Sequence, residues 1–439
     1  MNINSNDLLT VLSEALDCVE KEVLGVTDYH AKRVAWLGIQ MAKAANLSEK
    51  AIANIAIAAL LHDNALNAVK MDYENGNLKD GISGEKHCIA GAKNIELISD
   101  DPTIKEYVLF HHERANGSGP FGKLAHNTPL GAQIIHIADQ IDLAFALGSI
   151  DVNRLSDISE YVANQINTLF SKEVSELFLS VLSPQMLNTL AIKNINNLVL
   201  DFTPFPLSAT KQIAELFARI IDYKSPFTKV HSIGLANKAE QMGKFYNYDE
   251  EHITNLFIAG ALHDIGKIFV NNEVLEKPGR LNDEEYKHIQ SHAYETYRLL
   301  SKIKGLEDIR DWASYHHEKL NGKGYPFGLT GENMTKEMRL LACLDIYQAL
   351  TEDRPYKTGM PHGKAISILF ELAEKEELDL DIVSDINSVF SDGNSYEQTE
   401  SVALFQCKVC GFIYEGDSIP YDYECPVCGQ AAHVFSRIQ

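Results

Sequence analysis

The chain carries IANIAIAALLHD at residues 52–63 and ITNLFIAGALHD at residues 253–264. In both stretches apolar residues recur at three- and four-residue spacing, which is typical of a buried helix. Both end in an adjacent His-Asp pair, and imidazole and carboxylate groups are common metal ligands. The repetition of one apolar helix with one polar ending indicates that the chain contains two copies of a single unit.

Other ligand-type side chains recur around these pairs in the same order. His30 precedes His62 by 32 residues, just as His231 precedes His263 by 32. The remaining histidines and the final aspartate follow at near-equal intervals in both copies. The first copy carries His30, His62, Asp63, His87, His111, His112 and Asp139. The second copy carries His231, His263, Asp264, His292, His316, His317 and Asp345. We therefore predict two repeated domains, at residues 1–200 and 201–395.

The predicted fold is mainly α, with two all-helical bundles in tandem and a small four-cysteine β-hairpin domain at residues 402–439. Helical periodicity runs through most segments, and long alternating strand patterns are absent from the sequence. LNDEE, at residues 281–285, has the cap and acidic first turn of a helix start. The polar stretch at residues 393–401 is the predicted linker into the last domain.

Charge and hydropathy exclude several functions. The 439 residues include 39 Lys and Arg against 61 Asp and Glu, which gives a formal charge of -22. Such an acidic surface repels a phosphate backbone, so we expect no nucleic-acid polymer as a partner. No apolar run is long enough to cross a membrane, and the first residues lack the form of a signal peptide. We expect a cytoplasmic protein without a membrane partner.

The ligand set of the second copy predicts a two-metal site. Imidazole and carboxylate groups suit Fe, Mn or Zn. Neighbouring residues on a helix point about 100° apart, so an adjacent pair can serve two cations, with Asp264 as the natural bridge. Two such cations suit in-line displacement at phosphorus by an activated hydroxide. A single buried histidine is more often a core residue, but the complete ordered set favours metal.

Three motifs of the second copy carry a family resemblance. HDIGK at 263–267, HHEKLNGKGYP at 316–326 and DIYQALTEDRPYK at 345–357 resemble the HD-GYP subgroup of the HD phosphohydrolases. SPFTKVHS around His231 and KPGRLNDEEYKHIQSH before His292 add to it, so that the resemblance covers nearly all of residues 220–360. It implies a helical fold and a di- or trinuclear site, often of iron or manganese. The implied reaction is hydrolysis of a cyclic dinucleotide, usually cyclic di-GMP.

The resemblance also implies roles for individual residues. Asp264 and Lys267 become the catalytic candidates, with Lys267 steadying a phosphate oxygen or the attacking hydroxide. Arg and Lys at the end of the third motif would hold substrate phosphates, and Gly322 belongs to the turn of the GYP loop. The substrate-binding candidates are Arg354, Lys357, Gly324, Tyr325 and Pro326.

The second copy departs from the family at two positions. Gln348 stands where the family often has an aspartate three residues after the last metal ligand, which leaves guanine specificity open. Phe227 stands four residues before His231, where trinuclear members carry a glutamate. We therefore expect two Fe or Mn ions in the second copy.

The first copy matches the family only in part. Leu66 replaces the lysine, residues 117–120 read GSGP without the tyrosine, and no RPYK-like run follows Asp139. The retained ligands predict a second metal pair, while the missing cations predict weak or absent turnover. A sensor, a metal-stabilised scaffold, a site for another substrate and a decayed copy retained for packing are the alternatives.

Two CxxC pairs near the C-terminus predict a four-thiolate metal site. The cysteines are Cys407, Cys410, Cys425 and Cys428. Tetrahedral thiolate ligation fits iron or zinc. Residues 404–435 resemble the rubredoxin-like domain of rubrerythrins, which implies one redox-active iron, with zinc as the alternative. Cys18, Cys88 and Cys343 are interpreted as ordinary buried residues.

These features together predict a metal-dependent phosphodiesterase acting on a cyclic dinucleotide, cyclic di-GMP first, with redox regulation through the thiolate-bound iron. Cyclic GMP-AMP or another nucleotide is the nearest rival substrate. A non-catalytic nucleotide or redox sensor with a diiron site is the rival from another class. A redox donor and a homo-oligomeric state are left open as partners.

Overall fold

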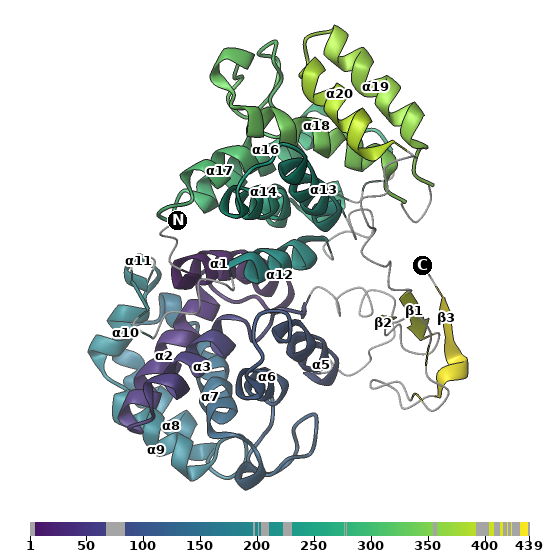
Figure 1. Ribbon diagram of the computed structural model, residues 1–439. Coiled ribbons are helices and arrows are strands. Elements are labelled where there is room, and N and C mark those ends of the chain that lie inside the picture. Colours follow the sequence, from purple (N-terminus) through teal and green to yellow (C-terminus); the bar gives the residue numbers. More distant parts are fainter. Residues whose placement is uncertain are drawn as a thin grey trace. The chain divides into compact units, whose positions relative to one another are not determined.

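The structure is a computed structural model. It describes residues 5–66, 84–195, 198–200, 202, 210–222, 231–275, 277, 279–353, 358–391, 404–407, 413–415, 419, 423 and 431–437. Two compact units, residues 1–389 and 390–439, make up the chain (Figure 1). Helices dominate the described part of the first unit, so the predicted mainly α fold is confirmed.

The described α-helices of the first copy lie between Ser5 and Ile195. They are α1 (Ser5–Leu24), α2 (His30–Ala44), α3 (Glu49–Leu60), α5 (Gly84–Ile95), α6 (Pro102–Leu109), α7 (Leu130–Phe145), α8 (Leu155–Asn164), α9 (Lys172–Val181), α10 (Pro184–Leu190) and α11 (Ile192–Ile195).

The second copy runs through an equivalent series. Its elements are α12 (Thr210–Asp222), α13 (His231–Phe245), α14 (Glu250–Leu262), the 3-10 helix η5 (Ile265–Phe269), α15 (Asn272–Leu275), α16 (Asp283–Leu300), α17 (Glu307–Ser314), α18 (Lys336–Thr351), α19 (His362–Glu374) and α20 (Leu380–Phe390).

The two copies use matching helices to place matching residues. Helices α2 and α13 both begin at the first histidine of their copy and have 15 residues each. Each packs against the following helix, α3 or α14, which ends just before the His-Asp pair. The apolar residues of α3 and α14 that recur in the sequence are almost all buried. Their burial fixes where the His-Asp pair emerges from the core.

Side-chain caps set the starts of the helices that carry the ligands. Asp249 caps α14 by accepting a hydrogen bond from the His252 backbone. Asn282 and Glu285 form a reciprocal capping box at the start of α16, so the helix start predicted at residues 281–285 is confirmed. Such caps satisfy backbone N–H groups that have no partner within the helix.

Helix α1 connects the two copies. It packs against α2 and α3 of its own copy and also against η5, α12 and α16 of the second copy. Lys302 on the second copy forms an ion pair with Glu14 on α1. Helix α1 therefore contacts both copies.

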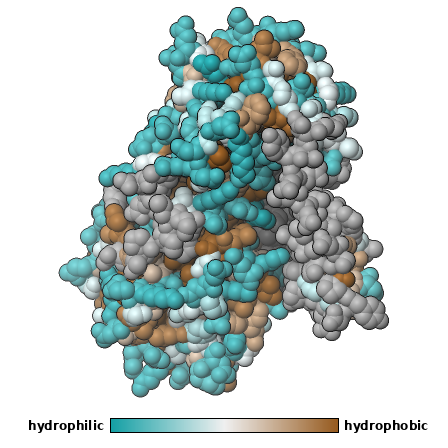
Figure 2. Space-filling model, viewed as in Figure 1, coloured by the Kyte–Doolittle hydropathy of each residue, from teal (hydrophilic) through white to brown (hydrophobic). Residues whose placement is uncertain are grey.

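Hydrophilic side chains predominate on the face of the described helices shown in Figure 2. Among the described helices, none combines the length and the apolar character that a bilayer crossing requires. The cytoplasmic location and the homo-oligomeric state stay predictions.

The second unit contains a small antiparallel sheet of order β2-β1-β3. Its strands are β1 (Leu404–Cys407), β2 (Ile413–Glu415) and β3 (Phe435–Arg437). Cys407 lies at the end of β1, where it pairs with Phe435. The other three cysteines of the predicted four-thiolate site, Cys410, Cys425 and Cys428, lie outside the described residues, as does the predicted linker at 393–401.

Candidate metal centres and active site

The first ligand group of the second copy lies around the ends of α13 and α14. His231 Nε2 is 3.0 Å from Asp345 Oδ1, and His263 Nε2 is 3.1 Å from Asp264 Oδ2. His231, His263 and Asp264 are buried and offer ligand atoms within 4.8 Å of one another. Side chains separated by more than 100 residues in sequence thus converge on one point.

A second group lies on the other side of Asp264. His292, His316 and His317 offer nitrogens that also lie within 4.8 Å of one another. Asp264 Oδ1 is 3.4 Å from His292 Nε2 and 3.9 Å from His316 Nε2. One carboxylate oxygen therefore faces each group, which is the geometry that a bridging ligand requires.

These residues fit a cation because two of their buried ligand atoms have no hydrogen-bond partner. Among the described residues, these atoms are His263 Nε2 and Asp264 Oδ1. An unpaired buried polar atom is costly, and two of them on adjacent ligand residues indicate a missing positive charge. Two Fe or Mn ions suit this donor set.

Backbone carbonyls fix the histidine tautomers. His263 Nδ1 lies 2.8 Å from Gly260 O, and His316 Nδ1 lies 2.6 Å from Ala313 O. Since a carbonyl can only accept, Nδ1 must carry the proton, which leaves the lone pair of Nε2 free for a metal. His292 Nδ1 makes the same contact with Ile289 O at 2.6 Å.

His231 is oriented by a carboxylate that the sequence did not single out. Its Nδ1 is 2.9 Å from Glu352 Oε2. Gln348 donates to the same Glu352 oxygen and accepts from Lys238 Nζ at 2.6 Å. Gln348 is 4% exposed and lies behind His231, to which it is linked through Glu352.

Lys267 lies beside the central aspartate. Its Nζ is 2.5 Å from Asp264 Oδ2, and 18% of its side chain is exposed. Gly266 lets η5 approach α16 closely, because a Cβ there would lie 1.9 Å from His292 O. Thr296 links the same elements by accepting from Gly266 N and donating to His263 O. Lys267 is thus held at the edge of the cluster with part of its side chain exposed.

The GYP loop is anchored by the glutamate of the His-His-Glu run. The Glu318 carboxylate accepts hydrogen bonds from the backbone of Phe327, Gly328 and Leu329. Gly324 packs against Glu318 so closely that a Cβ would lie 2.4 Å from its Cα. The loop is thereby held against the ligand cluster.

Tyr325 and Pro326, which the sequence predicts to bind substrate, also belong to this loop. The Tyr325 ring lies 4.7 Å from the His317 ring, and Pro326 follows it through a cis peptide bond. The predicted loop residues thus border the second ligand group.

Burial and charge set the protonation states of the cluster. Burial lowers the pKa of His292 to about 3 and also lowers the pKa of His316 and His317, so these imidazoles are neutral at pH 7. Burial would raise the pKa of Asp264, but the neighbouring His263 imidazole and Lys267 ammonium group hold it well below its usual range. Neutral imidazole and ionised carboxylate are the forms that bind metals.

The first copy brings its ligands together in the same way. Asp63 Oδ1 is 3.3 Å from His87 Nε2 and 3.5 Å from His111 Nε2, while Oδ2 is 3.6 Å from His62 Nε2. His30 Nε2 lies 3.3 Å from Asp139 Oδ1. The described residues therefore contain a second cluster with a central aspartate.

Behind His30, a different carboxylate takes the place of Glu352. Asp142 accepts from His30 Nδ1 at 2.6 Å and from Arg33 Nε at 2.7 Å. Leu66 is buried at the position of the second copy's lysine. The two clusters thus share their histidines and central aspartate but differ in the groups around them.

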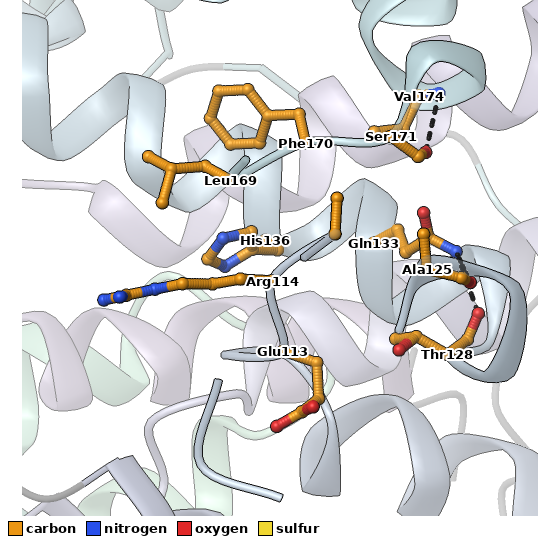
Figure 3. A pocket seen from close by; sticks show the side chains of 11 residues that line it. Glu113, Arg114, Ala125, Thr128, Gln133, His136, Leu169, Phe170, Ser171 and Val174 are labelled. Carbon is orange, nitrogen blue, oxygen red and sulfur yellow. Dashed lines mark hydrogen bonds between the residues drawn. The ribbon is translucent and has the colours of Figure 1, made fainter. Parts of the chain in front are cut away.

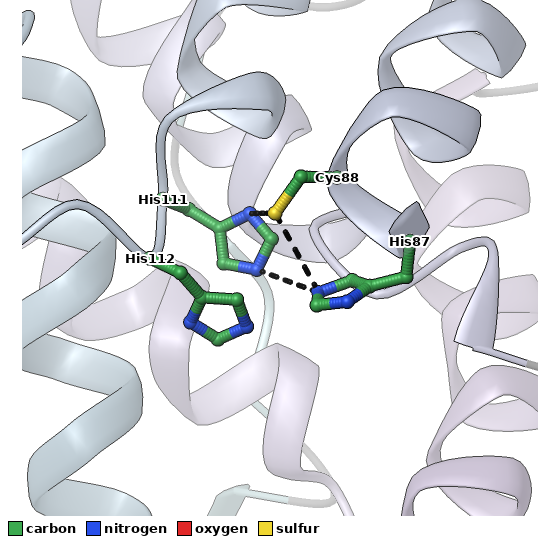
Figure 4. A group of neighbouring side chains, drawn as sticks. All are labelled: His87, Cys88, His111 and His112. Atoms are coloured by element: carbon green, nitrogen blue, oxygen red, sulfur yellow. Dashed lines mark hydrogen bonds between the residues drawn. The ribbon is translucent and has the colours of Figure 1, made fainter. Parts of the chain in front are cut away.

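Two ligand-type residues of the first cluster escaped the sequence reasoning. Figure 4 shows Cys88 between the two histidine rings, with Sγ 3.7 Å from His87 Nε2 and from His111 Nδ1. His112 belongs to the same group. Cys88 is buried as expected, but it lies among the candidate ligands rather than in an ordinary apolar core. Glu20 on α1 lies within the other half of the cluster, and burial raises its pKa well above the usual range.

A small cavity lies next to the first cluster (Figure 3). Its lining includes Arg114, Gln133, His136 and Phe170. His136 Nδ1 bonds to His111 O at 2.9 Å, while Nε2 has no hydrogen-bond partner among the described residues. The volume of about 10 Å³ admits one water and no nucleotide. We therefore regard it as a hydration site.

Three predicted positions cannot be placed. Arg354 and Lys357, the candidate phosphate-binding residues, lie outside the described residues, and so does Phe227. Their roles stay predictions.

Comparison with known families agrees with this architecture. Residues 27–144 and residues 215–382 each match the HD domain family. Residues 405–436 match the rubredoxin-like domain of rubrerythrin. The chain thus carries two HD domains in tandem and a C-terminal rubredoxin-like domain, as the sequence motifs predicted. The matched ranges fall inside the three predicted domains, whose boundaries stay predictions.

Its relatives are named as cyclic dinucleotide phosphodiesterases. 3'3'-cGAMP-specific phosphodiesterase 1 of Vibrio cholerae is 28% identical over 84% of this chain and 88% of its own length. 3'3'-cGAMP-specific phosphodiesterase 3 of the same organism is 30% identical over 68% of this chain and 65% of its own length. A cyclic di-GMP phosphodiesterase of Pseudomonas aeruginosa is 34% identical over 33% of this chain and 35% of its own length.

A solved structure supports the fold. The crystal structure of a cyclic GMP-AMP specific phosphodiesterase of Vibrio cholerae aligns with a TM-score of 0.60 at 21% identity. The alignment covers 88% of this chain and 97% of that one. At this identity, the likeness concerns the fold alone.

Proposed function

We propose that the second HD domain is a metal-dependent phosphodiesterase that hydrolyses a cyclic dinucleotide. The observation that carries this proposal is the position of Asp264 between two histidine groups, with Lys267 beside it. The names of the relatives support the substrate class.

The chain's own residues would prepare the site for attack at phosphorus. Two divalent cations, when bound, would supply positive charge at the phosphate and activate water. Lys267 is placed to donate to a phosphate oxygen or to hold the attacking water. Glu318 fixes the loop that brings Tyr325 beside His317, which closes one side of the site. The histidine–carbonyl contacts hold His263, His292 and His316 in the tautomer that the reaction needs.

Two cyclic dinucleotides are candidates. The family resemblance favours cyclic di-GMP. The relatives that match across both HD domains are named for 3'3'-cGAMP, whereas the cited relative named for cyclic di-GMP matches about a third of the chain. This wider match favours 3'3'-cGAMP as the second candidate, so both substrates belong in one direct comparison.

The test is turnover by the full chain. Anaerobically purified protein, loaded with Fe(II) or Mn(II), would be incubated with each dinucleotide and the products separated by chromatography. We expect linear dinucleotide or mononucleotide from at least one of them. Replacing His263 by Ala should lower the rate by at least about a hundredfold, because loss of a direct ligand exceeds the effect of losing a group behind it.

The matched control is His62→Ala in the first domain, which should leave turnover of the same substrate largely intact. Bound but uncleaved dinucleotide in every metal form would favour a sensor. Equal loss of activity in both variants would contradict the assignment to the second domain.

We also propose that the rubredoxin-like domain regulates the redox state of the HD site. The observation behind this is chemical: a four-thiolate iron site and a histidine–carboxylate site, both able to hold redox-active iron, share one chain. In this proposal an iron held by the four thiolates would supply one electron to iron held by the HD-domain ligands, and an external one-electron donor would reduce the module again.

A further inference from the structure

We propose that Glu20, on α1, is an additional metal ligand in the first HD domain and makes that site a closed metal centre. The ligand class is a divalent cation that accepts oxygen and imidazole donors, such as Mn(II) or Fe(II). Glu20 lies outside both the HD motif and the family match, which begins at residue 27.

The position of Glu20 points to a ligand. Its side chain is 1% exposed, and neither carboxylate oxygen has a hydrogen-bond partner among the described residues. Oε2 lies 4.0 Å from His30 Nε2, and the group Glu20, His62 and Asp63 offers ligand atoms within 4.8 Å of one another. A buried carboxylate without hydrogen bonds is strongly unfavourable unless a cation accompanies it.

Other polar atoms near Glu20 also lack hydrogen-bond partners among the described residues. His30 Nε2, His62 Nε2 and Asp139 Oδ1 are buried without hydrogen-bond partners within the described part of the chain. These three residues offer ligand atoms within 4.8 Å of one another, and His30 Nε2 is the atom that faces Glu20 Oε2. Unsatisfied polar groups that converge from α1, α2, α7 and the residue His62 after α3 are the expected shell of a metal ion.

The charged residues around the metal ligands differ between the first and the second domain. There, Lys267 contributes a positive charge 2.5 Å from the central aspartate. Here, the uncharged Leu66 takes that position and Glu20 adds a negative charge. The first site thus contains more negative charge and one more donor, which favours tight metal binding. The same donor would occupy a coordination position that a hydrolytic site keeps open.

The test is metal binding by the full chain with Mn(II) as the probe. Glu20→Gln keeps the shape of the side chain and removes its charge. Because loss of even an orienting group costs 10- to 100-fold in affinity, we expect the first-domain Mn(II) affinity to fall by about tenfold or more, measured by equilibrium dialysis in a His263→Ala background. The matched control, Glu14→Gln, changes a carboxylate of the same helix that pairs with Lys302, and it should bind Mn(II) as the parent does.

Thermal unfolding separates a ligand from a packing residue. Metal-free Glu20→Gln should unfold at or above the temperature of the metal-free parent, since it replaces a buried carboxyl group that has no hydrogen-bond partner among the described residues. Its stabilisation by Mn(II) should be smaller, as mass action requires. If the variant fails to fold, Glu20→Asp withdraws the charge by one methylene and should show the same loss of affinity. Unchanged Mn(II) affinity with unchanged stabilisation in either variant would overturn the proposal. Turnover by the second domain is measured separately in the Glu20→Gln single variant and is expected to persist. This measurement tests the proposed function of the second domain and not the role of Glu20.

Discussion

In each HD domain one carboxylate contacts Nδ1 of the first ligand histidine, but the two domains use a different residue for it. Glu352 accepts from His231 in the second domain, and Asp142 accepts from His30 in the first. Such a contact raises the basicity of the imidazole and fixes its orientation. Side chains from different positions of the two copies thus make the same contact with the histidine. The repeated motif therefore does not reveal which residue makes this contact.

Replacing Glu352 by Gln should weaken metal binding in the second domain by about 10- to 100-fold, because His231 loses its anionic partner. Metal content after chelator competition would measure this effect. Glu371→Gln changes an exposed carboxylate on α19 and serves as the control. Equal metal retention in the two variants would show that Glu352 does not support His231.

Among the elements, η5 and α16 pack against each other beside the ligand residues Asp264 and His292. Gly266→Ala should destabilise the fold by about 3 kcal/mol, because its Cβ would lie 1.9 Å from His292 O and the backbone would have to shift. Chemical denaturation measures the free energy of unfolding. Gly363→Ala is the matched control: a Cβ there meets no atom within 4 Å of the described structure, so it should stabilise α19 by about 0.5 kcal/mol. Similar effects of both substitutions would contradict the close approach.

The start of α6 gives an element-level prediction for pH. The Thr103 backbone hydrogen bond and Lys50 hold the pKa of Asp101 well below its usual range. A lowered folded-state pKa means that the stabilisation is complete above the unfolded pKa of about 4 and is lost as pH falls through the folded value.

Asp101→Asn keeps a side-chain acceptor at the cap but does not titrate. The difference in unfolding free energy between the parent and this variant should therefore be present at pH 7 and shrink under strongly acidic conditions. Denaturant titrations at several pH values would measure it. A difference in unfolding free energy that grows as pH falls would show that the pKa of Asp101 is not lowered by folding.

For the whole molecule, the proposed redox link joins the two compact units. Aerobic and reduced samples should differ in phosphodiesterase rate, and Cys407→Ser should abolish the difference, because it removes a thiolate of the iron site. Rates would be measured on matched iron-loaded samples, with Cys18→Ser as the control for a cysteine outside the module. Equal rates in aerobic and reduced parent protein would end this proposal.

Much of this molecule could be predicted from the sequence. The repeat of His-Asp, His-His-Glu and the last aspartate predicted two helical HD domains, and the paired CxxC motifs predicted the rubredoxin-like domain. These signals are local, because a helix presents its ligands at fixed spacing and its apolar face at a fixed period. Residue type then limits the chemistry that each position can perform.

Only the tertiary structure could place Glu20, Cys88 and Glu352. Glu352 lies 121 residues from His231, and Glu20 comes from a helix that precedes the motif. It also placed Gln348 at a buried position behind His231. The physical reason is that these partners are chosen by the packing of helices against one another, and no sequence periodicity encodes which distant side chains that packing brings together.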